Sequence, residues 1–211
     1  MAVIAPVLSR RRTALRAKYP KRLRANDGWI GDPKHQTSGS PENGGSDHNP
    51  NRRNRVDAED DDTRGDCHVP TMLASSFLHS STNYVIHRGR IWDADYRDFY
   101  PRTYTGKNQH DDHEHTSIHQ DPKAETSVEK WLFLESEPVW SKSIQQGSEG
   151  KEVRYTQAFL LAYGYALELD GVFGEGTGRC VEAFQRRYGL KPDRIVGPKT
   201  RKAFRTTKGV L

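Results

Sequence analysis

The sequence has few cysteines and few apolar residues. Only two cysteines, Cys67 and Cys180, occur among 211 residues. They lie in different parts of the chain and no Cys-x-x-Cys pair exists, so the sequence predicts neither a disulfide framework nor a cysteine-based zinc site. Hydrophobic residues make up 33% of the chain and its mean hydropathy is −0.92. No apolar run reaches the length of a membrane span, so we expect no membrane insertion.

The sequence also lacks the pattern of a secretory signal. The stretch from Met1 to Leu8 is mildly apolar but short, and the basic run Arg10-Arg11-Arg12 follows it, which is the reverse of the order in a signal peptide. We therefore expect synthesis in the cytoplasm. The net charge of +5 and the pI of about 9.2 favour a polyanionic partner, such as nucleic acid or a bacterial wall. No platform of aromatic and basic residues supports nucleic acid.

Periodicity predicts an α+β domain with a small antiparallel sheet over residues 1–137, followed by a linker over 138–146. The elements expected there are helices over Leu8–Tyr19 and Pro70–Ser80, a hairpin over Asn83–Trp92 that turns at Arg88-Gly89, and a strand over His113–Ile118. Residues 26–55 are rich in Gly, Pro, Ser, Asn and Asp and show almost no apolar periodicity. Because this long irregular segment carries His48, we expect it to be functional.

The remaining residues, 147–211, have a different pattern. Helical spacing of apolar residues occurs near 152–163, 177–188 and 198–206. Two related turns, Asp170–Thr177 and Asp193–Thr200, share an Asp, two apolar residues, a Gly and a Thr at matching offsets. This duplicated turn-helix unit predicts a small all-α domain of three helices.

Three histidines stand within six residues, at His110, His113 and His115. On a strand, His113 and His115 point to one face because side chains alternate with a period of two. One of them can bind a metal ion while the other faces the substrate, and His110 can line the same pocket. His48 and one carboxylate of the run Asp57–Asp62 would complete three ligands and leave the fourth position open, as in catalytic zinc sites. A further imidazole can then act as the base for amide hydrolysis.

The same strands carry acidic residues at the alternate positions, Glu59, Asp61 and Glu114. A buried carboxylate is costly unless it is paired. These residues therefore require either partners or strands that are exposed to solvent.

Several of these segments together resemble a group of zinc peptidases that includes D-Ala-D-Ala carboxypeptidases, penicillin-insensitive murein endopeptidases and related phage endolysins. The matching segments are Ser46-Asp47-His48, Ala58-Glu59-Asp60 and His113-Glu114-His115. The resemblance implies that His48, Asp60 and His115 bind Zn²⁺, that His113 is catalytic and that His110 is a further histidine of the active site. Asp57 is the alternative to Asp60, because His48 and Asp60 are farther apart than is common in the family.

Residues 147–211 resemble a three-helix peptidoglycan-binding domain, with Arg194 where a Gly is usual. The combination predicts a monomeric endolysin whose zinc endopeptidase cuts stem-peptide or cross-link amides of peptidoglycan. Such an enzyme would be made in the host cytoplasm and would act on the wall once the membrane is permeabilised, causing lysis. Two alternatives stay open. One is a D-Ala-D-Ala carboxypeptidase, and the other is a non-catalytic wall-binding or virion structural protein with a structural zinc ion.

Overall fold

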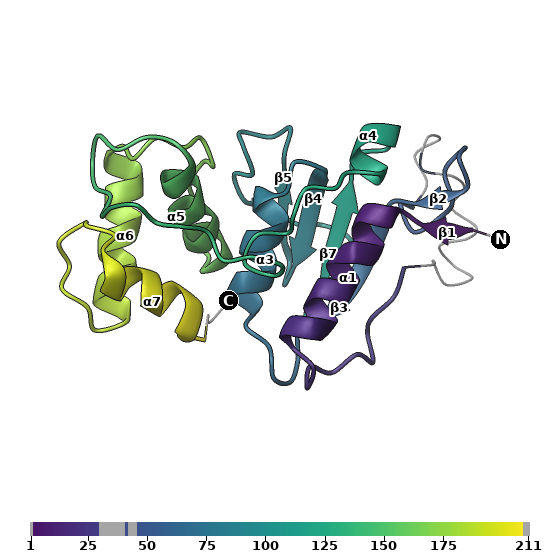
Figure 1. Cartoon of the computed structure of the whole chain (residues 1–211), viewed down its shortest axis with the longest axis horizontal. Helices are drawn as coiled ribbons and strands as arrows, with labels where there is room; N and C mark the ends of the chain where they lie inside the picture. Colours follow the sequence, from purple (N-terminus) through teal and green to yellow (C-terminus); the bar gives the residue numbers. More distant parts are fainter. Residues whose placement is uncertain (1, 30–40, 42–45, 209–211) are drawn as a thin grey trace.

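A five-stranded sheet with helices on one face, followed by three further helices, makes up the chain (Figure 1). This computed structural model describes residues 2–29, 41 and 46–208, so part of the irregular segment predicted over 26–55 lies outside the described residues. The helices are α1 (Pro6–Lys18), α3 (Val69–Leu78), α4 (Pro122–Glu125), α5 (Lys151–Ala162), α6 (Glu175–Arg187) and α7 (Pro198–Thr206). Among the described residues, none of the helices is long and apolar enough to span a membrane.

The sheet is antiparallel throughout, with the strand order β3-β7-β4-β5-β6. Its strands are β3 (Ala58–Asp62), β4 (Thr82–His87), β5 (Arg90–Asp93), β6 (Arg102–Thr103) and β7 (His113–Ile118), and a separate parallel pair joins β1 (Val3–Ile4) to β2 (Arg55–Val56). The central strand β7 therefore pairs with β3 on one side and with β4 on the other, which brings the acidic run beside the histidines.

The predicted elements are present. Strand β7 has the predicted limits, and the hairpin of β4 and β5 turns at Arg88-Gly89, where both residues have a positive φ, of 46° and 69°. Such a turn follows the twist of the two strands that it joins. The observed helices differ from the predicted ranges by a few residues at their ends, which is ordinary for helix boundaries. The mixed fold with a small antiparallel sheet and a helical C-terminal part agrees with the sequence.

A buried cluster of charges joins α1 to the sheet. The side chains of Arg11, Glu59, Asp61 and Glu114 are all fully buried. Arg11 Nη1 lies 3.1 Å from Glu59 Oε1 and also pairs with Asp61, while Nη2 lies 2.7 Å from Glu114 Oε1. The carboxylates that the sequence left without a partner therefore meet one guanidinium, whose fork of donors suits several acceptors at once.

Two more basic side chains complete the charge balance of this cluster. Arg12 Nε lies 3.5 Å from Glu59 Oε2, and Arg22 Nη2 lies 3.6 Å from Asp61 Oδ1. From α3, Ser76 donates a hydrogen bond of 2.6 Å to Glu114. Both α1 and α3 consequently lie on the same face of the sheet, and the opposite face carries His113 and His115.

The three C-terminal helices contain a repeated hydrogen-bonded turn. The amide of Gln157 donates to Asp170, Val172 and Thr177, and the backbone N–H of Gly171 donates back to it. The amide of Gln185 makes the equivalent bonds, to Asp193, Ile195 and Thr200, with Arg194 in place of Gly171. Gly171 and Arg194 have φ values of 78° and 60°. Arg194 thus occupies a left-handed position that glycine adopts more easily, and its ion pair with Glu182 at 2.6 Å helps to hold it there.

The helical part shares one hydrophobic core with the sheet part. Buried residues of α3, among them Leu73 and Phe77, belong to the same cluster as Phe159 of α5 and Phe204 of α7. Phe133, which precedes the predicted linker, packs edge-to-face on Phe159 with ring centroids 4.7 Å apart. Within the predicted linker 138–146, Ile144 is buried and pairs with Val196. The three C-terminal helices are therefore packed against α3, and they are not connected to the sheet only through a flexible linker.

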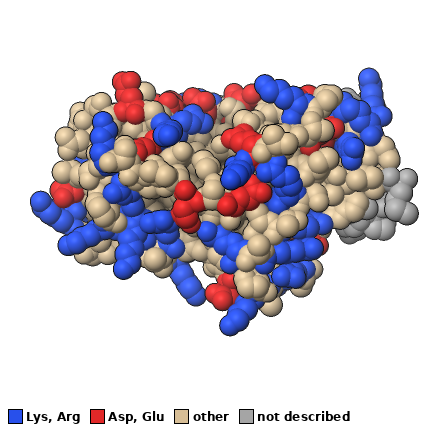
Figure 2. Space-filling model, viewed as in Figure 1, with Lys and Arg blue, Asp and Glu red and all other residues tan. Residues whose placement is uncertain are grey.

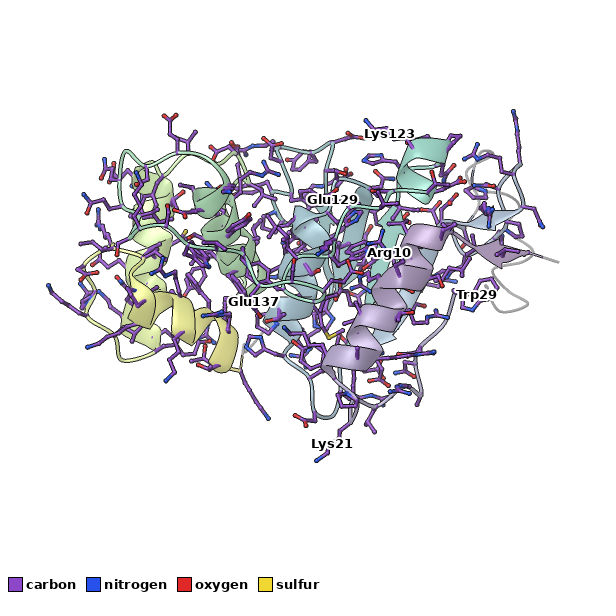
Figure 3. The ribbon with its side chains drawn as sticks, viewed as in Figure 1. Arg10, Lys21, Trp29, Lys123, Glu129 and Glu137 are labelled. Carbon is purple, nitrogen blue, oxygen red and sulfur yellow. The ribbon has the colours of Figure 1, made fainter. Side chains whose placement is uncertain are left out.

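We predict that Arg11→Met destabilises the fold by about 3–5 kcal/mol, because it leaves buried carboxylates without their main counter-charge. Denaturation in urea measures the change. Arg10 provides the matched control, since it lies one residue away on α1 (Figure 3) and forms a partly exposed pair with Glu135. Arg10→Met should cost less than about 1 kcal/mol. Equal losses in the two variants would contradict the structural role given to Arg11.

Candidate metal centre

The pairing of β3 with β7 brings the first two candidate ligands together. Asp60 is the direct cross-strand neighbour of His115, so both side chains lie on the face opposite to α1. The distance from His115 Nδ1 to Asp60 Oδ1 is 3.0 Å. The register also places Asp62 opposite His113, whose side chain lies on the same face.

His48 reaches this pair from the loop before β2. Its Nδ1 lies 3.3 Å from the carbonyl oxygen of Trp29, to which a protonated Nδ1 donates. This bond orients the ring so that Nε2 faces the other candidate ligands, as is usual for metal-binding histidines. The side chain of His48 is buried.

Asp47 holds this loop against the sheet. Tyr84 donates a hydrogen bond of 2.8 Å to its carboxylate, and Gln120 donates another of 2.8 Å. The Tyr84 ring also stacks on His115, with centroids 5.4 Å apart. The sequence analysis missed both Asp47 and Tyr84. The period of two along β4, which puts Tyr84 and Ile86 on one face, was the available signal for Tyr84.

The distances in this group fit a zinc ion. The His48 Nε2 atom lies 3.1 Å from His115 Nδ1 and 3.4 Å from Asp60 Oδ2. Ligands at about 2.0–2.1 Å from a tetrahedral zinc ion lie about 3.3 Å from one another. Two imidazole nitrogens and one carboxylate, at separations of 3.0–3.4 Å, therefore form a suitable donor set, which would supply three of the four ligands of a tetrahedral ion.

The electrostatics act differently on the three candidate ligands. Burial alone would raise the pKa of Asp60, but hydrogen bonds and charge from His115 and His48 hold it well below its usual range. Burial lowers the pKa of His115, which outweighs the opposite effect of Asp60. An ionised carboxylate therefore faces a neutral imidazole at His115 around neutral pH. Burial acts to lower the pKa of His48, but the hydrogen bond and charge of Asp60 raise it above its usual value, so a metal ion would have to displace a proton from His48 more often than from His115.

His113 and His110 lie beside this group. The rings of the two histidines are 4.8 Å apart, and His113 Nε2 lies 3.9 Å from Asp60 Oδ1. The other ring nitrogen of His113, Nδ1, lies 3.0 Å from the Asp112 carboxylate, which orients the imidazole. Burial, together with the neighbouring histidines, lowers the pKa of His110 to about 4.

Asp57, the alternative ligand, belongs to another cluster. Its carboxylate accepts a hydrogen bond of 2.6 Å from Asn51, which also donates to Glu125. Burial, then repulsion by Glu125 and Asp47, raises the pKa of Asp57 to about 7, although the Asn51 bond acts in the opposite direction. Both groups of potential ligands in the described residues contain Asp60, and neither contains Asp57.

Comparisons with known proteins concern the helical part. A family described as "Putative peptidoglycan binding domain" matches residues 149–204. These residues are a peptidoglycan-binding domain. The match covers helices α5, α6 and α7 together with both repeated turns.

The relatives of this chain are similar to it over the peptidoglycan-binding domain. The "Zinc D-Ala-D-Ala carboxypeptidase" of Streptomyces albus G is 42% identical over 65 residues, which are 29% of this chain and 26% of that protein. The "Probable N-acetylmuramoyl-L-alanine amidase" of Bacillus licheniformis is 36% identical over 64 residues, 29% of this chain and 18% of that protein. The solved Burkholderia AP3 phage endolysin is 38% identical and has a TM-score of 0.30, with 31% of this chain and 25% of that chain covered. The chain spans about a quarter or less of the length of these curated relatives.

We predict that Asp57→Asn stabilises the protein increasingly as the pH rises from 5 to 8. The folded state holds the Asp57 proton more tightly than the unfolded chain, so ionisation of Asp57 lowers stability above its unfolded pKa. Removing the charge should gain about 1–2 kcal/mol at pH 8, after allowance for solvent screening, and less at pH 5. Thermal melts at both pH values measure this. The exposed Asp66→Asn serves as control, and a gain for Asp57→Asn that does not grow with pH would contradict the interpretation.

Proposed function

We propose that this chain is a zinc-dependent endopeptidase of the endolysin type, which hydrolyses stem-peptide or cross-link amide bonds of peptidoglycan. The observation that carries the proposal is the group of His48, Asp60 and His115 at zinc-ligand separations, with His113 beside it. The peptidoglycan-binding domain supplies the partner, because it holds the chain on an insoluble polymer and raises the local concentration of the site.

The donor set supports catalysis more than a purely structural role. A zinc ion held by His48, Asp60 and His115 would supply a Lewis acid that polarises the scissile carbonyl and activates water at neutral pH. A structural site needs no additional imidazoles, yet His113 and His110 lie next to the ligands. Their position therefore favours the enzyme over a non-catalytic wall-binding protein.

His113 is suited to carry the proton in this reaction. With Nδ1 held by the Asp112 carboxylate, Nε2 is the atom that faces Asp60 and the proposed reaction centre. It can take a proton from the nucleophile and pass it to the leaving amine. His110, whose lowered pKa keeps it neutral at pH 7, can donate a hydrogen bond to the oxyanion without carrying a full charge.

The positive charge of the peptidoglycan-binding domain can also contribute to binding of the wall. Residues 147–211 contain twelve Lys and Arg against seven Asp and Glu, so their net charge of +5 equals that of the whole chain. Figure 2 shows many of the blue Lys and Arg atoms on the side where Figure 1 places α6 and α7. A positive field on this domain attracts the anionic groups of a wall.

A groove on the same domain offers a place for a wall fragment. It measures about 570 Å³ and lies between the end of α6 and the start of α7, with Leu190 and Ile195 among its walls and Lys191 and Lys199 along it. Apolar walls with a few charged groups suit an amphipathic ligand such as a peptide-bearing sugar. We infer that the groove contacts peptidoglycan.

We predict that Lys191→Ala combined with Lys199→Ala weakens binding to purified peptidoglycan by roughly fivefold, since two exposed charges contribute about 1 kcal/mol together. Co-sedimentation over a range of protein concentrations measures this. Lys123→Ala with Lys130→Ala removes the same charge from the other part of the chain, where Lys123 lies on α4 (Figure 3). Equal weakening in both double variants would indicate a general charge effect and no role for the groove.

The activity itself is tested with zinc-loaded protein on purified diaminopimelate-type peptidoglycan, with a chelated control and mass spectrometry of the products. New amino and carboxyl ends within cross-links or stems, absent with chelator, are the expected result. Release of D-alanine alone would instead identify a D-Ala-D-Ala carboxypeptidase. Binding without products would overturn the enzymatic proposal and leave a wall-binding protein.

We predict that His113→Ala lowers the cleavage rate by about 10²–10⁴-fold, the usual contribution of a general acid–base group. The ion at His48, Asp60 and His115 should stay bound, because His113 is not among its ligands. Metal analysis after dialysis at low free zinc checks this, and His119→Ala, which removes a histidine outside the ligand group, should keep both properties. Unchanged cleavage by His113→Ala would refute the role of His113.

A further inference from the structure

Three buried ring nitrogens at or next to the candidate metal centre have no hydrogen-bond partner within the described residues. They are Nε2 of His113, Nδ1 of His110 and Nε2 of His115, and the first two belong to neighbouring rings outside the first ligand group. His113 and His110 are largely buried residues, with 8% and 7% of their surfaces exposed. An unpartnered buried polar atom costs free energy, so a site that retains two of them side by side calls for a ligand.

Asp60 connects these two histidines into a second group of ligand atoms. One ligand atom each from Asp60, His110 and His113 lies within 4.8 Å of the others. The same carboxylate serves the first group, with His48 and His115. Because a carboxylate has two oxygens and several lone pairs, it can serve two neighbouring cations at once.

The backbone at His110 is also held in a special conformation. Its φ of 55° is in the left-handed region, which a non-glycine residue adopts at some cost. Two hydrogen bonds fix it there: the His110 N–H donates to the Asn108 side chain, and the His110 carbonyl accepts from Arg88. The imidazole is thereby directed at His113 and His115, whose ring centroids are 4.8 Å and 5.4 Å away.

We propose that Asp60, His110 and His113 form a second divalent-cation site, which is weaker than the first and which inhibits the peptidase when zinc fills it. The inhibitory part rests on the proposed function, because a cation on Nε2 of His113 takes the lone pair that would accept the proton. The donor set, two imidazoles and one carboxylate, again suits zinc.

The geometry explains why this site is the weaker one. His113 Nε2 and Asp60 Oδ1 are 3.9 Å apart, wider than the roughly 3.3 Å between ligands of a tetrahedral zinc ion, so side chains must move to close on the ion. The first group already has separations of 3.0–3.4 Å. Two cations that share one carboxylate also repel each other. Zinc should therefore fill the first site before the second.

Metal stoichiometry tests the second site without relying on activity. Metal-free protein is dialysed against buffers of increasing free Zn²⁺, and bound zinc is measured by elemental mass spectrometry. The full chain should bind a first equivalent at low free zinc and a second at higher free zinc. His110→Ala should bind one equivalent, while His119→Ala, matched in chemistry but outside both groups, should bind two. Circular dichroism confirms that each variant is folded.

Two stoichiometry results would overturn the proposal. One is a single equivalent of bound zinc in the full chain at saturation. The other is two equivalents of zinc bound by His110→Ala, because the second ion would then lie at a different site. Cleavage measured over the same zinc range tests inhibition, with activity expected to rise as the first site fills and to fall as the second fills. A steady plateau would refute the inhibition. Two equivalents without cleavage at any zinc concentration would refute the proposed function and leave the second site standing.

Discussion

The ion cluster around Arg11 is the interaction on which the sheet and its candidate site depend. Strand β3 is acidic at four consecutive positions, 59–62, so carboxylates must lie on both of its faces. On one face Arg11 of α1 compensates Glu59 and Asp61, together with Glu114 of β7. That compensation allows β3 to pair with β7 as a buried strand, and this pairing is what sets Asp60 opposite His115 on the other face. The candidate metal ligands therefore depend on a charge network that they do not touch.

The sequence predicted local features well and distant pairings poorly. A period of two put His113 and His115 on one face, and turn chemistry identified the hairpin at Arg88-Gly89, since both depend on neighbours in the chain. The partner of Glu59 is Arg11, which lies 48 residues earlier in the chain. The sequence around Arg11 predicts only a basic helix, so no local pattern reveals this pairing. The strand register, which is likewise not visible in a local pattern, places the two candidate carboxylates differently. Asp60 and Asp57 are both acidic, but only Asp60 faces His115, whereas Asp57 meets Asn51. The assignment of ligand roles stays a prediction.

The repeated turns of the peptidoglycan-binding domain show a similar limit. The matching Asp, Gly and Thr residues were visible in the sequence, but the side chains that tie each turn together, Gln157 and Gln185, come from the preceding helix. Each glutamine is buried. Its side-chain amide donates hydrogen bonds to an Asp and a Thr of its turn and accepts one from a backbone N–H of the same turn. Because these bonds fix the turn, the second repeat can place Arg194 where the first has Gly171. That substitution looked like a departure from the family pattern, and the structure gives it a physical basis.

The shared core changes how the two parts of the chain work together. A flexible linker would raise the local concentration of the site on the wall but leave its orientation free. Here α3 packs between the sheet and α5, and His68 at the start of α3 lies 2.8 Å from the carbonyl of Thr207 beyond α7. Binding through the basic helical domain would therefore also orient the face of the sheet that carries Asp60 and the histidines. Since the net charge of +5 belongs entirely to residues 147–211, electrostatic attraction to an anionic wall would act on the peptidoglycan-binding domain itself. The remainder, with no net charge, would follow it in a fixed orientation.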